Sequence, residues 1–91
     1  MKISVTETAL QWFQSEWGFT SGDHVRVFVR YGGDGGFSLG VGKAKPDNVA
    51  VSETVAGIYF FVTADDAWYL NDKSLRIDYD EAADDIVYQI C

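Results

Sequence analysis

The sequence has one cysteine, one proline, one histidine and no long apolar run. A lone cysteine, Cys91, excludes an internal disulfide and an intramolecular zinc site built on cysteines. No apolar stretch approaches the ~20 residues that a membrane-spanning helix needs. The N-terminal "MKISVTETALQWF" turns polar too early for a signal peptide. These absences predict a cytoplasmic protein that does not enter a membrane.

Basic residues are also few, with seven Lys and Arg against fourteen Asp and Glu and a formal net charge of −7. Proteins that bind nucleic acid gather Lys and Arg against the phosphates. The charge therefore disfavours binding to nucleic acid or to an anionic membrane surface. It serves solubility first, and a metal ion or a basic protein patch is the better electrostatic partner.

What the chain does have is a 47% hydrophobic composition over 91 residues, enough for one domain spanning 1–91 with a modest core. Apolar residues at helical spacing predict a helix over 7–17 with a buried aromatic face. Thr63 and Asp66 resemble a capping box before a short helix at 67–70. Alternating apolar residues predict strands at 3–5, 24–31, 37–41, 49–52, 57–62, 75–79 and 86–90. Because the two helices do not alternate with the strands, the order favours an α+β fold, mainly β, with a mostly antiparallel sheet.

One motif invites a catalytic interpretation. Residues 36–40 match G-x-S-x-G, but that motif needs a helix after its serine, and Ser38 lies within a strand pattern. The only histidine, His24, is upstream of it, and no other nucleophile–base pair is evident. We therefore expect no enzymatic activity.

The carboxylates at 78–85 could supply oxygen ligands to a hard cation, but a solvated acidic turn is the simpler interpretation. Several aromatic residues pose a similar choice. They could line a pocket or a contact surface, although core packing is the more common role for such residues. They are Tyr31, Phe37, Tyr59 and Trp68.

Three segments, "ISVTETALQWF", "VRVFVRYGGDGGFSLGV" and "GIYFFVTADDAWYLNDKSLRIDYDE", together resemble the HesB/IscA-like family of A-type iron–sulfur carriers, in particular its short YneR-like branch. The resemblance covers nearly the whole chain. It implies a HesB-like β-sandwich or pseudo-barrel with helices packed on it. It also implies an accessory role in iron–sulfur cluster assembly or iron handling, with assembly or recipient proteins as partners and a homodimer left open.

The ligand residues of that family do not carry over. The family's carriers place a cysteine after paired glycines and a C-x-C pair near the C-terminus. Here Asp34 follows Gly32 and Gly33 in a glycine-rich loop that Gly35 and Gly36 complete, and Cys91 matches neither tail cysteine. Asp34 and Cys91 are left as the candidate metal ligands, and the missing cysteines disfavour iron or an iron–sulfur cluster as cofactor. The alternative function is a protein-interaction or small-ligand-binding module with no role for a metal.

Overall fold

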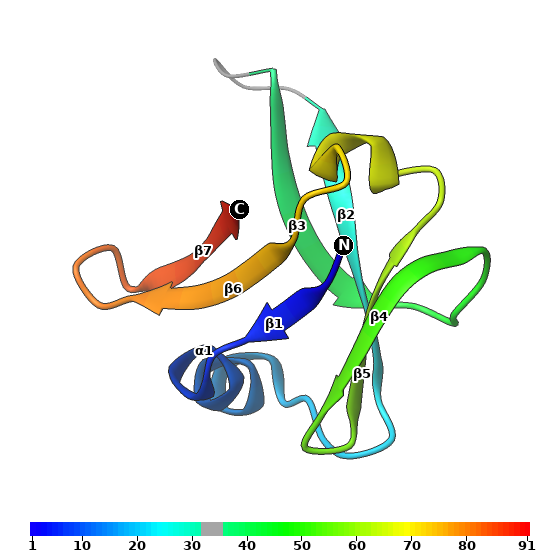
Figure 1. The fold of residues 1–91 in the computed structure, drawn as a ribbon. Helices are drawn as coiled ribbons and strands as arrows, with labels where there is room; N and C mark the ends of the chain where they lie inside the picture. Colours follow the sequence, from blue (N-terminus) through cyan, green and yellow to red (C-terminus); the bar gives the residue numbers. More distant parts are fainter. Residues whose placement is uncertain (32–35) are drawn as a thin grey trace.

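The computed structural model describes residues 1–31 and 36–91, and strands dominate in them (Figure 1). The chain is mainly β with one α-helix, so the predicted α+β class is confirmed, although the second predicted helix is a short 3-10 turn. The elements are β1 (Ile3–Val5), α1 (Glu7–Trp12), the π-helical turn η1 (Phe13–Trp17), β2 (His24–Tyr31), β3 (Phe37–Lys43), β4 (Val49–Val55), β5 (Ile58–Thr63), the 3-10 turn η2 (Ala67–Leu70), β6 (Leu75–Asp80) and β7 (Asp85–Ile90).

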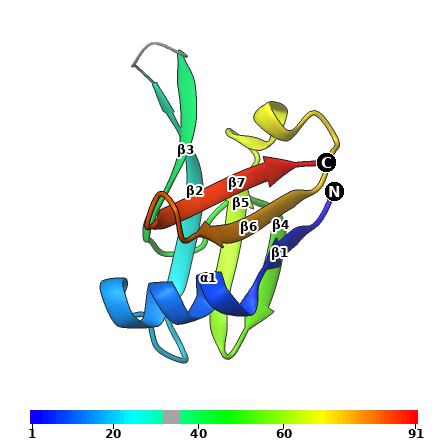
Figure 2. The same ribbon diagram turned by 90° about the vertical axis from the view of Figure 1, so that its left-hand side faces the viewer.

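The described strands form two sheets, one of three strands in the order β1-β6-β7 and one of four in the order β3-β2-β5-β4. Each sheet holds one parallel pairing, β1 with β6 and β2 with β5, and the other pairings are antiparallel. Figure 2 shows β6 and β7 crossing in front of the long strands of the other sheet, with α1 below β6 and β7 in this view. The expected mixed and mostly antiparallel pairing is confirmed, but it is divided between two sheets.

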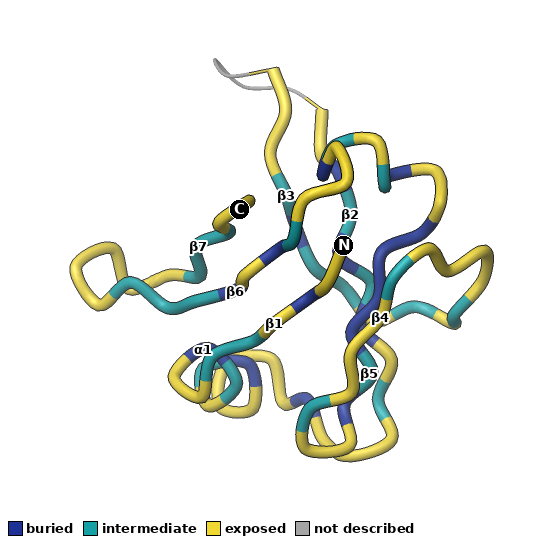
Figure 3. The backbone as a smooth tube through the Cα atoms, viewed as in Figure 1, coloured by how far each residue is buried: buried dark blue, intermediate teal, exposed yellow. Residues whose placement is uncertain are grey.

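The hydrophobic core lies between the two sheets (Figure 3). Val25, Val27 and Val29 on β2 are buried, as their alternation predicts, while the residues between them are not. Burying a side chain of this size stabilises the fold by about 1.5–3 kcal/mol. The other members of the core come from both sheets, the helix and two connections: Ile3, Ala9, Phe13, Phe19, Ile58, Phe60, Val62, Leu70, Leu75 and Ile77.

The helix begins at Thr6, whose hydroxyl oxygen accepts a hydrogen bond from the Ala9 amide at 3.2 Å. The same hydroxyl donates to the Asp78 carboxylate on β6 at 2.8 Å. Thr6 therefore caps the helix and fixes it to the sheet of three strands.

No helix in the described residues is long and apolar enough to cross a membrane.

The predicted helix at 7–17 is helical throughout, but it changes from α to π geometry at Phe13. It ends at Gly18, which adopts the left-handed conformation with φ of 68° that favours glycine. Phe13 is fully buried, as predicted, whereas Trp17 is 45% exposed. The wider π-helical turn directs this last aromatic residue away from the core.

The capping box predicted at Thr63 and Asp66 is wrong. Thr63 is the last residue of β5, and no side chain caps η2. Both residues instead accept hydrogen bonds from the guanidinium of Arg26 on β2, Asp66 at 2.8 Å and Thr63 at 3.4 Å. Because Arg26 is a half-buried cation beside β5, a carboxylate partner for it outweighs a cap on a turn of four residues.

Candidate functional site

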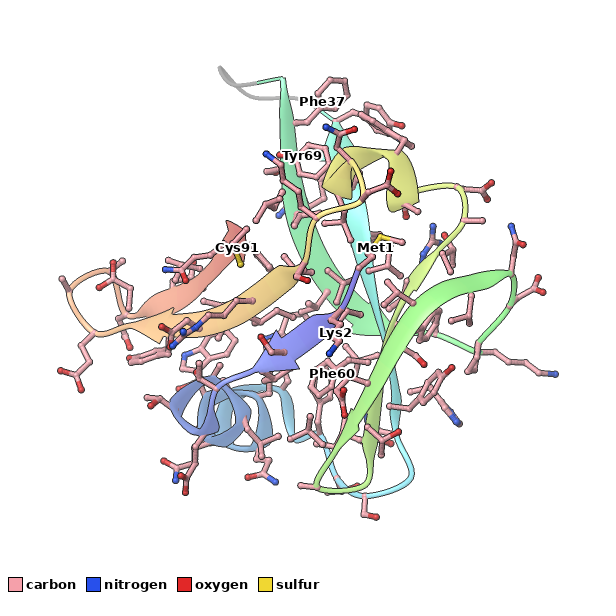
Figure 4. All side chains as sticks on the ribbon, in the orientation of Figure 1. Met1, Lys2, Phe37, Phe60, Tyr69 and Cys91 are labelled. Atoms are coloured by element: carbon pink, nitrogen blue, oxygen red, sulfur yellow. The ribbon has the colours of Figure 1, made fainter. Side chains whose placement is uncertain are left out.

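Four aromatic side chains gather where the β2–β3 hairpin meets η2, and we call them the aromatic cluster: Tyr31, Phe37, Trp68 and Tyr69. Phe37 is at its centre, with ring centroids 5.2 Å from Tyr31, 5.5 Å from Trp68 and 6.5 Å from Tyr69, all edge to face. Figure 4 shows Phe37 and Tyr69 together near the end of the hairpin. The cluster joins two elements that lie far apart in the sequence.

The cluster is open to solvent. Tyr31 is 73% exposed, Trp68 is 52% exposed and Phe37 is 45% exposed. The edge-to-face geometry is the one that aromatic rings prefer, and each such pair is worth about 0.5–1.5 kcal/mol where it is buried. Exposed aromatic side chains that hold one another in place form a preorganised apolar surface.

The hairpin places half of the cluster beyond the limit of the core. Tyr31 and Phe37 form the last pair of the β2–β3 ladder, one step along the same face from Val29 and Leu39. Val29 is buried and Leu39 is half-buried, so the core ends at this pair. The two aromatic residues therefore share the core's face of the sheet but lie past its edge.

The turn η2 supplies the other half and is attached at both ends. Leu70 is 1% exposed and belongs to the core, and Asn71 ends the turn in the left-handed conformation with φ of 49°. The ion pair between Arg26 and Asp66 attaches its start to β2. With Leu70 pointing inward, Trp68 is left on the outer side against Phe37.

The prediction that core packing is the role of Tyr31, Phe37, Tyr59 and Trp68 is wrong for three of them. Tyr31, Phe37 and Trp68 are exposed and lie together. Tyr59 is half-buried and lies apart from them, with its ring centroid 5.8 Å from that of His24. Tyr69 was not singled out, and the only signal for it was its position next to a tryptophan in a short helix.

Most of the predicted metal-binding loop lies outside the described residues, namely Gly32, Gly33, Asp34 and Gly35. Gly36 is described and has a φ of 80°, which fits the turn expected there. Cys91 is exposed, and its backbone pairs with that of Ser74 at the end of β7. Over residues 1–31 and 36–91, no group of three or more His, Cys, Asp and Glu residues is close enough to hold a metal ion.

Four of the five carboxylates at 78–85 accept hydrogen bonds from residues of the described chain. The Tyr79 hydroxyl donates to Asp84, which raises the pKa of Tyr79 to about 12. Asp80 accepts from the Ala82 amide at 3.0 Å. The pKa of Asp78 is lowered by the hydrogen bond that its carboxylate accepts from the Tyr79 amide and, to a lesser extent, by the one from the Thr6 hydroxyl. The simpler interpretation, an acidic turn, describes this segment.

Comparison with known proteins gives a relative of nearly the same length. No family model matches the chain. This chain is 42% identical over 93 residues to the pyruvate dehydrogenase inhibitor of Bacillus subtilis (strain 168), and the match covers 98% of each protein. The chain belongs to the family of that inhibitor. An uncharacterized protein of Staphylococcus saprophyticus is 33% identical, and one of Staphylococcus epidermidis is 28% identical, each again over nearly the whole chain.

The expected role in iron–sulfur cluster assembly or iron handling is wrong. The relative that is 42% identical is named for inhibition of pyruvate dehydrogenase, not for iron–sulfur biogenesis. The expectation of iron–sulfur assembly or recipient proteins as partners is wrong for the same reason. The exposed cluster agrees better with the alternative, a protein-interaction module.

Proposed function

We propose that this protein inhibits pyruvate dehydrogenase by binding to it through the aromatic cluster. The observation that carries the proposal is the exposed, preorganised group of Tyr31, Phe37 and Trp68 in a chain whose full-length relative is named as such an inhibitor. Trp and Tyr are enriched among the few residues that supply most of the binding energy at protein interfaces. The target is a protein, and the surface has the composition of a protein contact.

The proposed inhibition needs no catalytic step by this chain. The cluster consists of one phenylalanine, one tryptophan and two tyrosines, and it offers apolar area rather than an acid–base pair. A non-enzymatic inhibitor that works by occupying a surface of its target needs no more than that.

We further propose that the two-sheet fold is of the HesB type, as a fold alone. The order of elements supports it, with β1 and α1 first, then the β2–β3 hairpin, and η2 before the last two strands. A shared fold carries no function with it, since function depends on particular residues. In this protein those residues are aromatic.

The test is a titration of purified pyruvate dehydrogenase from the same organism with the purified chain, following pyruvate-dependent activity. Wild type should reduce the activity to a plateau, and the double variant Phe37→Ser with Trp68→Ser should fail to do so. Val49→Ser is the matched control, because Val49 is 37% exposed on β4, at the opposite edge of the same sheet. Full inhibition by the double variant would show that the cluster is not the contact.

A further inference from the structure

A second feature lies next to the aromatic cluster, along the outer edge of β3. This strand is the first in its sheet and pairs only with β2. It begins at Phe37, the centre of the cluster, and continues to Lys43. A strand with one neighbour leaves every second backbone N–H and C=O without a partner in its sheet.

The register shows which groups these are. The Ala44 amide donates to the His24 carbonyl at 3.1 Å, one step beyond the pairing of Val25 with Lys43. In an antiparallel ladder, hydrogen-bonded and non-hydrogen-bonded pairs alternate. The residues of β3 that bond to β2 are therefore Ser38, Gly40 and Gly42. By this alternation the backbone groups of Leu39 and Val41 face away from β2, on the side of β3 that has no neighbouring strand. Among the described residues, no backbone hydrogen bond outside the strand ladders engages them.

These two residues line a cavity of about 400 Å³. Its other walls include Trp12 and Trp17 from the helical segment and Ile86 and Tyr88 from β7. Arg30 and Asp85 contribute one charge of each sign. The recess thus has the edge strand β3 on one side and aromatic, aliphatic and two charged side chains on the others.

The two outer strands of this sheet differ in how they are protected. β4 has an irregularity in its register between Val49 and Val51 and carries Glu53. Bulges and charges are the usual means by which proteins prevent pairing at a sheet edge. β3 has an unbroken register and no charged residue before Lys43. Of the two outer strands of this four-stranded sheet, β3 is the one whose described edge is left ready for pairing.

We propose that an extended segment of the target enzyme, with apolar residues at alternate positions, adds to β3 as a further strand. Main-chain hydrogen bonds to Leu39 and Val41 would provide affinity, and the walls of the recess would accept the apolar side chains. This inference rests on the proposed function, because the segment continues from the contact at Phe37. A second copy of the chain fits less well, since it would bring its own β7 wall to the same recess.

The test is hydrogen–deuterium exchange at single-residue resolution, on the free chain and on its complex with pyruvate dehydrogenase. The amides of Leu39 and Val41 should exchange rapidly in the free chain and at least about tenfold more slowly in the complex. The amides of Ser38, Gly40 and Gly42, already bonded to β2, provide the internal control and should be slow in both. A complex that forms without protecting Leu39 and Val41 would overturn strand addition and leave the proposed function standing.

The remaining outcomes are equally decisive. If no complex forms, the proposed function and this inference fail together. Protection of Leu39 and Val41 that rises with concentration of the free chain would assign the edge to a second copy. A pair of variants tests the backbone directly, because Val41→Pro removes the outward N–H whereas Val41→Ala removes only side-chain atoms. Binding by folded Val41→Pro should be at least about tenfold weaker than binding by Val41→Ala, and equal binding would contradict the proposal.

Discussion

Replacing Trp68 with alanine should weaken binding to pyruvate dehydrogenase far more than it destabilises the fold. Trp68 is 52% exposed in the free chain, so about half of its surface remains to be buried by a partner. Large aromatic side chains bury about 150–250 Å², which leaves roughly 100 Å² for the interface. At about 25 cal/mol per Å² the contact is worth about 2.5 kcal/mol. This corresponds to a roughly 60-fold increase in Kd.

The effect on folding should be small. Trp68 has edge-to-face contacts with Phe37 and Tyr69, but its outer half is already in water. We expect the free energy of unfolding to fall by less than about 1 kcal/mol, because substitutions at exposed positions rarely cost more. Urea unfolding of wild type and variant checks this value.

The binding constant is measured by biosensor titration of immobilised pyruvate dehydrogenase with each variant. Trp68→Phe is the matched control, because it keeps an aromatic ring against Phe37 and should lose less than about tenfold in affinity. Trp68→Ala binding within about threefold of wild type, with its fold intact, would refute the assignment of Trp68 to the interface.

Three further predictions concern the stability of the fold. Asp66→Ala leaves the guanidinium of Arg26 without its carboxylate partner and should lower the free energy of unfolding in urea by about 1–3 kcal/mol. An unchanged urea midpoint would show that the ion pair does not stabilise η2. Gly57→Ala should lower the free energy of unfolding by about 2 kcal/mol or more, because φ at Gly57 is 78° and an added Cβ would overlap the Ser21 hydroxyl. Adding Ser21→Gly should restore part of the lost thermal midpoint. If the midpoint does not recover, the overlap is not the cause. Asp78 has a lowered pKa in the folded state, so its contribution to stability is present above the unfolded pKa of about 4 and is lost as the pH falls. The loss of unfolding free energy on acidification should therefore be shallower in Asp78→Asn than in wild type. Identical pH profiles of stability would contradict this role of Asp78.

The alternation of apolar residues predicted much of the fold. The buried valines of β2 and the buried Leu75 and Ile77 of β6 were found from spacing alone, because a strand with one buried face repeats every two residues. The pairing of Arg26 with Asp66 was not found, since the two residues are 40 positions apart and only the parallel pairing of β2 with β5 brings them together. A local motif, the capping box, was chosen in its place.

The candidate site was harder to predict for a similar reason. Alternation shows which face Tyr31 and Phe37 occupy, but not how far along the strands the core extends. Whether Phe37 is buried or exposed depends on η2, which packs beside the hairpin from elsewhere in the chain. The function was misassigned because it was inferred from the resemblance of three sequence segments to a family, although the cysteines that would carry the chemistry were missing.

The central claim is that inhibition follows from contact at the aromatic cluster. The most direct measurement compares two constants for wild type, Trp68→Phe and Trp68→Ala: the Kd for pyruvate dehydrogenase and the concentration that halves its activity. We predict that both constants rise by the same factor across the three proteins. A variant that loses binding yet inhibits as well as wild type would contradict the account.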